Sequence, residues 1–359
     1  MITISLCMIV KNEQETLERC LESVKGLADE IVIVDTGSTD RTKEIAGKWT
    51  DKVIDYVWID DFAAARNFSF AQATMDYILW LDADDVLLPE DREKSLRLKQ
   101  TLDPLVDAVS MEYHAAFDPH GNVSIKLRRF RLVKRSKQFQ WQGVVHEDLI
   151  VKGYFIDSDI VVTHRQAHGV SDRNLKIYEK RMREKKEFTT RDLMHYAMEL
   201  HFHRMPDKAI GIYLQLMNRP DMTPDDMILV CMNAADCCYQ QGDEEKEWEL
   251  MCKTLQYGTP RPDFCCRLGL RLYEKKKYRE AIFWFKLALE LPPPQSNWGL
   301  QNEAFQTWMP HIQLSLCYHR LGEYESAYHH TKIALSYRPG DEQLQKNLSA
   351  LGQLLNQKE

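Results

Sequence analysis

The sequence predicts an α/β domain with a mostly parallel sheet, followed by an all-α domain built from helical repeats. Its 359 residues suit two domains of ordinary size. Apolar β-rich runs alternate with helical patterns in the first half, and after about Asp172 only helical patterns remain. We therefore expect one domain over residues 1–188 and a second over residues 189–359.

The first half reads as alternating strands and helices. Residues 2–10 form a continuous apolar run, and Leu17, Cys20, Leu21 and Val24 then recur at helical spacing. The same alternation predicts further strands and helices: strands at 30–35, 52–58, 77–82 and 107–117, and helices at 39–49, 63–74 and 89–102. This order is typical of a parallel sheet covered by helices.

The second half contains similar segments at 196–220, 266–293 and 312–339, with a degenerate copy at about 230–263. In each clear copy a first helix ends in a polar turn, an alanine lies in the second helix, and a proline follows. These segments resemble tetratricopeptide repeats, whose small residues let paired helices pack closely. A generic helical bundle is the alternative.

Composition limits the classes of function. Hydrophobic residues make up 44% and the net charge is -7, which is typical of a globular protein and does not favour a nucleic-acid binder. The nine cysteines form no CxxC pair, so we expect reduced thiols and a cytoplasmic location. The sequence shows no basic leader and no run of about 18 apolar residues, so neither secretion nor a transmembrane anchor is expected.

Acidic side chains follow three predicted strands. Asp35, Asp60–Asp61 and Asp82–Asp85 each come directly after an apolar run. Ligands bind beyond the carboxyl ends of strands in such sheets, so these residues should face one crevice. Three carboxylates within LDADD predict a hard cation, Mn²⁺ or Mg²⁺, shared with the diphosphate of a nucleotide. The alternative is an acidic loop that caps the next helix.

The runs ISLCMIVKNE, VDTGSTD and DAD occur in the order and spacing of inverting family 2 glycosyltransferases with the GT-A fold, and the chain resembles that family. The segments 60–67, 79–85, 139–149 and 161–169, followed by tetratricopeptide-like helices, make it similar to bacterial peptide glycosyltransferases. The resemblance implies transfer of a sugar from a nucleotide donor.

The resemblance also implies a set of donor-binding residues. Asp35 would recognise the base, Asp82 would lie near the ribose and the metal, and Arg66 would bind phosphate or fix the acidic loop. Trp141 would form a sugar or acceptor platform, with a core tryptophan as the alternative. The full expected set is Asp35, Thr36, Asp61, Arg66, Asn67, Asp82 and Trp141.

The HED triplet at 146–148 would supply the general base that inversion requires. Glu147 is the first choice and Asp148 the alternative, while His146 would orient the loop or touch phosphate. For the metal, the resemblance implies Asp84, Asp82 and a histidine. We expect His164 in that place rather than His168, and an imidazole ligand suits Mn²⁺ better than Mg²⁺.

One basic stretch, residues 126–137, has seven Lys or Arg side chains and no acidic one. It lies between the DxD and HED motifs, so an anionic donor or an acidic acceptor is a closer use than nucleic acid. The alternative is a solvated basic face.

The whole sequence thus predicts a metal-dependent transferase acting on a UDP-sugar, with a peptide or protein side chain (Ser, Thr or Cys) as acceptor. A lipid-linked saccharide or polysaccharide acceptor is the first alternative, and an interaction scaffold with a nucleotide-sensing domain is the second. A nucleotidyltransferase would need a glycine-rich loop where this chain has Lys11-Asn12-Glu13. A homodimer is kept among the expected assemblies; the sequence does not identify the sugar.

Overall fold

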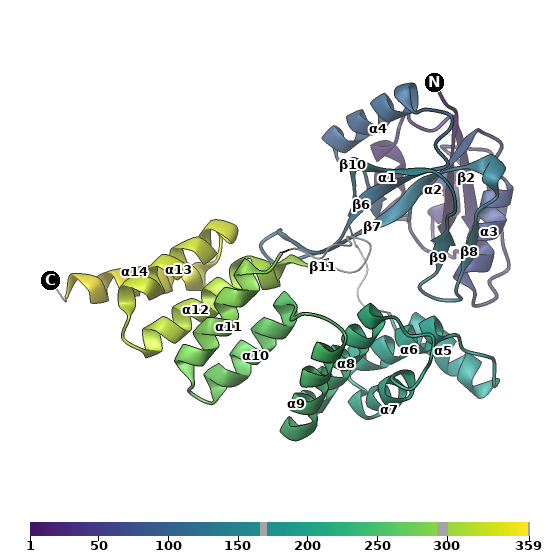
Figure 1. The fold of residues 1–359 in the computed structure, drawn as a ribbon. Coiled ribbons are helices and arrows are strands. Elements are labelled where there is room, and N and C mark those ends of the chain that lie inside the picture. Colours follow the sequence, from purple (N-terminus) through teal and green to yellow (C-terminus); the bar gives the residue numbers. More distant parts are fainter. Residues whose placement is uncertain (166–170, 293–300, 358–359) are drawn as a thin grey trace. The chain divides into compact units, whose positions relative to one another are not determined.

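The computed structural model describes residues 1–165, 171–292 and 301–357 (Figure 1). The chain divides into two compact units. Unit 1 consists of Met1–Ala115 and Leu127–Arg204, and unit 2 of Ala116–Lys126 and Met205–Glu359. The functional boundary expected at residue 188 stays a prediction, because compactness alone does not define where a catalytic domain ends.

The central sheet is built mainly from strands of the first 164 residues. Its main strands are β1 (Ile4–Val10), β2 (Glu30–Asp35), β3 (Val53–Asp55), β4 (Tyr77–Trp80), β5 (Asp85–Val86), β6 (Ala108–Phe117), β7 (Val123–Lys134) and β10 (Phe155–His164). They lie in the order β3-β2-β1-β4-β7-β6-β10-β5. The α/β class predicted for the first domain is confirmed.

The sheet is mixed. Strands β1, β2, β3 and β4 pair in parallel, with Val10 opposite Asp35 and Cys7 opposite Trp80. Strand β7 then runs antiparallel to β4, whereas β6 and β10 are parallel to each other. The carboxyl ends of β1, β2 and β4 therefore meet at one edge, which is where the acidic residues follow.

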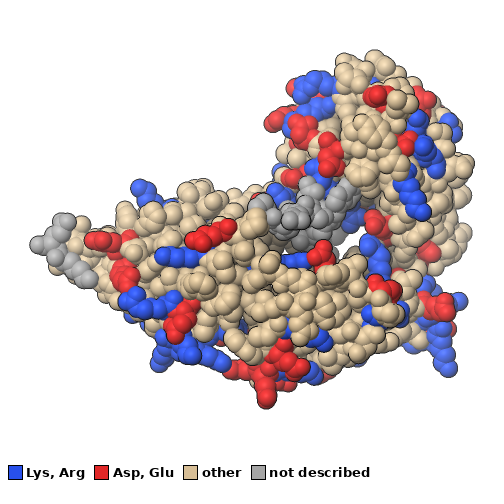
Figure 2. Space-filling view, viewed as in Figure 1, with Lys and Arg blue, Asp and Glu red and all other residues tan. Residues whose placement is uncertain are grey.

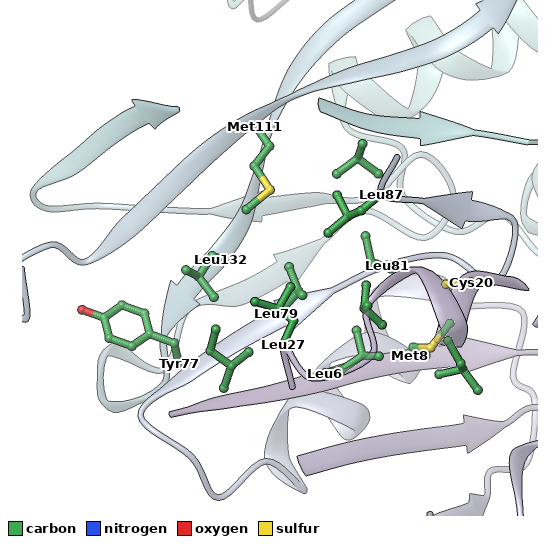
Figure 3. Close-up of a cluster of buried hydrophobic side chains, with 14 of the residues drawn as sticks. Leu6, Met8, Cys20, Leu27, Tyr77, Leu79, Leu81, Leu87, Met111 and Leu132 are labelled. Atoms are coloured by element: carbon green, nitrogen blue, oxygen red, sulfur yellow. The ribbon is translucent and has the colours of Figure 1, made fainter. Parts of the chain in front are cut away.

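Helices cover both faces of this sheet. The helices of unit 1 are α1 (Leu17–Ser23), α2 (Thr42–Ala46), α3 (Phe62–Ala71), α4 (Pro89–Thr101), α5 (Arg173–Arg183) and α6 (Thr190–Phe202). Helices α1, α2, α3 and α4 confirm the four helices that the sequence predicts in these regions. Side chains of α1, α2 and α4 pack with Leu6, Leu79 and Met111 in one apolar cluster (Figure 3). A second cluster joins α3 to the small ribbon of β8 (Gln140–Gln142) and β9 (Asp148–Ile150).

The described residues of unit 2 are mainly helical, apart from the 116–126 segment and the short strand β11 (Gln301–Asn302), which pairs with β7. Its α-helices are α7 (Pro206–Leu216), α8 (Pro224–Gln240), α9 (Glu244–Lys253), α10 (Pro262–Glu274), α11 (Tyr278–Glu290), α12 (Trp308–Arg320), α13 (Tyr324–Tyr337) and α14 (Glu342–Asn356). The predicted repeat alanines Ala209, Ala281 and Ala327 are fully buried. This burial fits close helix packing. Within the described residues, no helix is both long and apolar enough to cross a membrane.

Gly269 lets α10 and α11 approach each other closely. A Cβ at this position would lie 2.7 Å from two ring atoms of Phe285, which is itself fully buried. Gly269→Ala should therefore destabilise unit 2 by about 1–3 kcal/mol through overpacking. Thermal unfolding followed by circular dichroism measures this loss.

Gly211→Ala is the matched control, because this glycine lies inside α7 and a Cβ there would meet no atom within 4 Å. The same substitution should be neutral or stabilise by up to about 1 kcal/mol. Equal effects at the two positions would contradict the packing explanation.

Candidate active site

A cavity of about 320 Å³ lies at the edge of unit 1 where the parallel strands end. Its wall includes Val10 at the end of β1, Thr36 after β2 and Asp82 after β4. Among the residues predicted for function, the cavity is lined by Thr36, Arg66, Asp82, Asp84, His146, Glu147 and His164. The topology thus brings together side chains that are more than 100 positions apart, in a volume typical of small-molecule sites.

Arg66 connects two of the predicted functional carboxylates. It lies on α3, and its Nη2 donates to Oδ1 of Asp82 while its Nε donates to Oε1 of Glu147, both at 2.6 Å. The guanidinium is buried against the rings of Trp80 and Trp141, at 4.8 and 4.9 Å from their centroids. These paired charges stabilise each other in a region shielded from water.

The Arg66 charge also sets protonation. Burial disfavours the Asp82 carboxylate, but the attraction of Arg66 outweighs it and lowers the pKa of Asp82 to about 2. In the same way the two carboxylates outweigh burial and raise the pKa of Arg66. Arg66 and Asp82 are therefore both charged at neutral pH.

A second buried ion pair holds the acidic turn in place. Nη1 of Arg131 lies 2.9 Å from Oδ2 of Asp85, and both side chains are fully buried. The guanidinium stacks on Trp80 at 3.8 Å and on Tyr113 at 4.6 Å. Oδ2 of Asp85 also accepts a hydrogen bond from the backbone N–H of Asp82 at 3.1 Å. Asp85 therefore fixes the turn that presents Asp82 and Asp84 to the cavity.

Asp84, Asp85 and His164 form a cluster that suits a cation. One ligand atom from each lies within 4.8 Å of the others. Nδ1 of His164 is 3.4 Å from Asp84 and 3.5 Å from Asp85. Nδ1 of His164 and Oδ1 of Asp85 are buried without a hydrogen-bond partner among the described residues. Two such atoms facing each other fit a bound divalent ion.

The cluster agrees only in part with the ligand set expected from sequence. Asp84 and His164 lie together, but Asp82 is paired with Arg66, and Asp85 completes the cluster instead. Burial works against a charged imidazole, yet the adjacent carboxylates outweigh it and raise the pKa of His164 to about 10. His168, the alternative ligand, lies outside the described residues.

Asp35 lies at the end of β2, and only one of its two carboxylate oxygens has hydrogen-bond partners among the described residues. Its side chain is buried, and Oδ1 accepts hydrogen bonds from the backbone N–H groups of Gly37 and Ser38 at 3.0 and 2.9 Å. Oδ2 is buried and has no partner among the described residues. Thr36 beside it donates through Oγ1 to the carbonyl of Val10 at 3.1 Å and reaches the cavity wall.

The three residues of the HED triplet have different surroundings. Glu147 lines the cavity and is bound to Arg66, whereas Asp148 is exposed, outside the cavity lining, and 3.8 Å from Arg191. His146 lines the cavity with a left-handed backbone, φ 53°. Its Nε2 lies 2.7 Å from Oε1 of Glu199 on α6. Glu147 is thus the acidic side chain of this triplet that faces the cavity.

Four of the expected donor residues are not among those that line the cavity: Asp35, described above, and Asp61, Asn67 and Trp141. Asp61 caps α3 by accepting a hydrogen bond from the backbone N–H of Ala64 at 2.9 Å. Asn67 exchanges two hydrogen bonds with the backbone of Trp141, at 3.0 and 2.8 Å. Trp141 itself is a core side chain packed edge-on against Trp80. Asp61, Asn67 and Trp141 position Arg66 and are not among the residues that line the cavity.

The basic stretch 126–137 divides between structural and cavity positions. Arg128 is buried and donates to Ser110 and to the carbonyl of Ser158. Arg129 and Arg131 line the cavity. Residues two apart on a strand share a face, so this alternation could have been read from the sequence. Positive and negative side chains are interspersed on the molecular face shown in Figure 2.

Sequence comparisons agree with this geometry. Residues 5–149 match the family model of glycosyl transferase family 2, and residues 262–295 match a tetratricopeptide repeat model. Residues 5–149 form a family 2 glycosyl transferase domain. The match spans β1 to β9 and ends just after the HED triplet, so it contains the acidic turn, Arg66 and Glu147.

Individual proteins are similar to parts of this chain. A TPR repeat-containing protein of Synechococcus elongatus is 40% identical over 148 residues, which are 41% of this chain and 35% of that protein. The SPbeta prophage-derived glycosyltransferase SunS of Bacillus subtilis is 28% identical over 230 residues, 60% of this chain and 53% of SunS. A solved glucosyl-3-phosphoglycerate synthase from Mycobacterium tuberculosis has a TM-score of 0.34 at 14% identity, covering 53% of this chain and 81% of that one. The chain spans about half or less of the two sequence relatives.

Loss of the Arg66 charge should destabilise unit 1. Arg66→Gln leaves the buried Glu147 carboxylate without its cation and removes the partner of Asp82. Breaking a buried pair in this way costs about 3–5 kcal/mol, reduced here because Asp82 is one-third exposed. Denaturant unfolding of the variant measures the change.

The control is Arg97→Gln on α4, which removes the same charge from a side chain that is 65% exposed. Its effect should stay within about 0.5 kcal/mol. An Arg66→Gln variant as stable as this control would contradict the role given to the two ion pairs.

Proposed function

We propose that this chain is a metal-dependent, inverting glycosyltransferase that moves a sugar from a nucleotide donor, a UDP-sugar, to a side chain of a peptide or protein. The observation that carries the proposal is one cavity lined by Glu147 and by Asp84 and His164, two members of the Asp84–Asp85–His164 cluster. Such a transfer needs a carboxylate that accepts a proton and a bound cation that interacts with the diphosphate.

The donor nucleoside is assigned to the end of β2. The unpaired Oδ2 of Asp35 is a hydrogen-bond acceptor in a buried position, which suits the imide N–H of uracil. Thr36 would complete the nearby wall. This arrangement supports a uridine nucleotide as donor, and the identity of the sugar is left open.

The cation is assigned to Asp84, Asp85 and His164. A divalent ion held there would act as a Lewis acid toward the leaving diphosphate. Carboxylate oxygens suit both Mg²⁺ and Mn²⁺, while the imidazole nitrogen favours Mn²⁺. Because the carboxylates keep His164 protonated at neutral pH, ion binding should release a proton from this imidazole.

Glu147 is assigned the role of general base. The acceptor hydroxyl or thiol attacks C1 of the sugar, its proton passes to Glu147, and the bond from C1 to the diphosphate oxygen breaks. Arg66 holds Glu147 through Oε1 and so orients the carboxylate toward the cavity. A single displacement of this kind inverts the configuration at C1.

A peptide or protein acceptor is supported by the repeat domain. Residues 262–295 match a tetratricopeptide repeat, and stacked helical repeats offer extended surfaces on which peptides bind. The alternative acceptor is a lipid-linked saccharide or polysaccharide. All nine cysteines are free, which supports a reducing compartment such as the cytoplasm.

Asp84→Ala should weaken Mn²⁺ binding by about tenfold or more, because it removes one of the three side chains assigned to the ion. Titration of free Mn²⁺ by electron paramagnetic resonance measures this directly. Asp55→Ala is the control, since it removes an equal charge from an exposed residue at the end of β3. If both variants bind Mn²⁺ as the wild type does, the cation site is wrongly placed.

Glu147→Gln should lower turnover by about 10²–10⁴-fold and leave UDP affinity nearly unchanged, since glutamine keeps the acceptor for Arg66 but cannot take the proton. Release of UDP from UDP-sugars in the presence of peptide acceptors gives the rate. Asp148→Asn is the matched control and should retain activity, because Asp148 is exposed outside the cavity lining. If Asp148→Asn lost turnover and Glu147→Gln retained it, the general base would be Asp148 and not Glu147.

A further inference from the structure

Arg129 is a cavity-lining cation for which the structure gives no counter-charge. It projects from β7 into the cavity wall. Its Nε is buried and makes no hydrogen bond, and no carboxylate among the described residues lies within ion-pair distance of it. The two neighbouring arginines differ in this respect, because Arg66 and Arg131 each bind a carboxylate at 2.9 Å or less.

The surroundings of Arg129 disfavour its charge. Burial, and then the like charge of Arg131 two residues along the strand, lower the pKa of Arg129. Glu147 and Asp82 attract it only at longer range, since both are bound to Arg66. A desolvated, unpaired guanidinium costs folding free energy and is therefore most easily explained by a ligand that neutralises it.

Arg129 shares a neighbour and a cavity with the Asp84–Asp85–His164 cluster. The ring of Tyr113 lies 6.0 Å from the Arg129 guanidinium carbon and 6.0 Å from the ring of His164. Arg129, Tyr113, Asp84 and His164 all line the cavity, so an anion at Arg129 would share it with an ion held by the cluster. The planar fork of an arginine is suited to two oxygens of a phosphate or a carboxylate.

We infer that Arg129 is an oxyanion-binding residue of the donor site, beside the cation cluster. The inference rests on the proposed function for the nature of the donor. The oxyanion has two sources in such a donor: the diphosphate that leaves, or a carboxylate on the transferred sugar. Both would bind the same guanidinium, so experiments must separate them.

The first experiment measures binding of inorganic pyrophosphate at saturating Mn²⁺ to the wild type, Arg129→Gln and the exposed control Arg97→Gln. A charge-assisted pair is worth about 1.5–3 kcal/mol, so Arg129→Gln should bind about tenfold or more weakly and the control unchanged. This result assigns the diphosphate. It requires no sugar transfer, so it stands even if the proposed reaction is wrong.

The second experiment compares UDP-glucuronate with UDP-glucose as competitors for UDP on the same three proteins. A preference of the wild type for UDP-glucuronate that disappears in Arg129→Gln would assign the carboxylate of the sugar. If neither pyrophosphate affinity nor sugar preference changes in Arg129→Gln, the inference is overturned.

Thermal unfolding separates ligand binding from a structural role. Removal of an unpaired, partly desolvated charge should raise the melting temperature of Arg129→Gln, by about 2–4 °C for each kcal/mol gained. Arg129→Lys keeps the charge without the fork and should recover part of the pyrophosphate affinity. Loss of affinity accompanied by a lower melting temperature in both variants would mean that Arg129 supports the fold, and would overturn the inference.

Discussion

The site depends on the need to neutralise one buried guanidinium. Arg66 lies against two tryptophan rings in a region shielded from water, and a cation there is tolerated only with its counter-charges in place. Those counter-charges are Asp82, after β4, and Glu147, in the loop before β9. The same interaction therefore fixes the acidic turn and the predicted base at a set distance from each other, across a separation of 65 residues in the chain.

A second ion pair also places a buried arginine against an acidic side chain, and it lies deeper in the protein. Arg131 and Asp85 are fully buried, and Asp85 also binds the backbone of the acidic turn. With Asp82 and Asp85 each paired to an arginine, three carboxylates can crowd into one turn without prohibitive repulsion. Three buried atoms have no hydrogen-bond partner among the described residues: Oδ1 of Asp85, Nδ1 of His164 and Nε of Arg129. His164 and Arg129 both line the cavity. These atoms are the basis of the cation and anion positions that we propose.

Much of the fold could be predicted because its signals are local. Apolar runs in the sequence predicted the positions of β1, β2 and β4, and the ends of the predicted strands indicated which acidic residues belong to the site. Contacts between distant residues were harder to predict. The family resemblance implied Asp82 as a metal ligand, and the sequence did not indicate that Asp82 pairs with Arg66 or that Asp85 lies beside Asp84 and His164. The basic stretch 126–137 could be predicted as a strand or hairpin, but its antiparallel pairing with β4 could not, because strand direction depends on long-range pairing and not on periodicity.

We expect the cavity to bind a nucleoside diphosphate together with a divalent cation. Calorimetric titration of UDP into the wild-type protein, with GDP as the control and with Mn²⁺ or a chelator present, measures this binding. Binding should be tight with Mn²⁺, selective for UDP over GDP, and largely lost in the chelator. Absence of binding by either nucleotide in the presence of Mn²⁺ would contradict this expectation and would favour a scaffold function for the repeats.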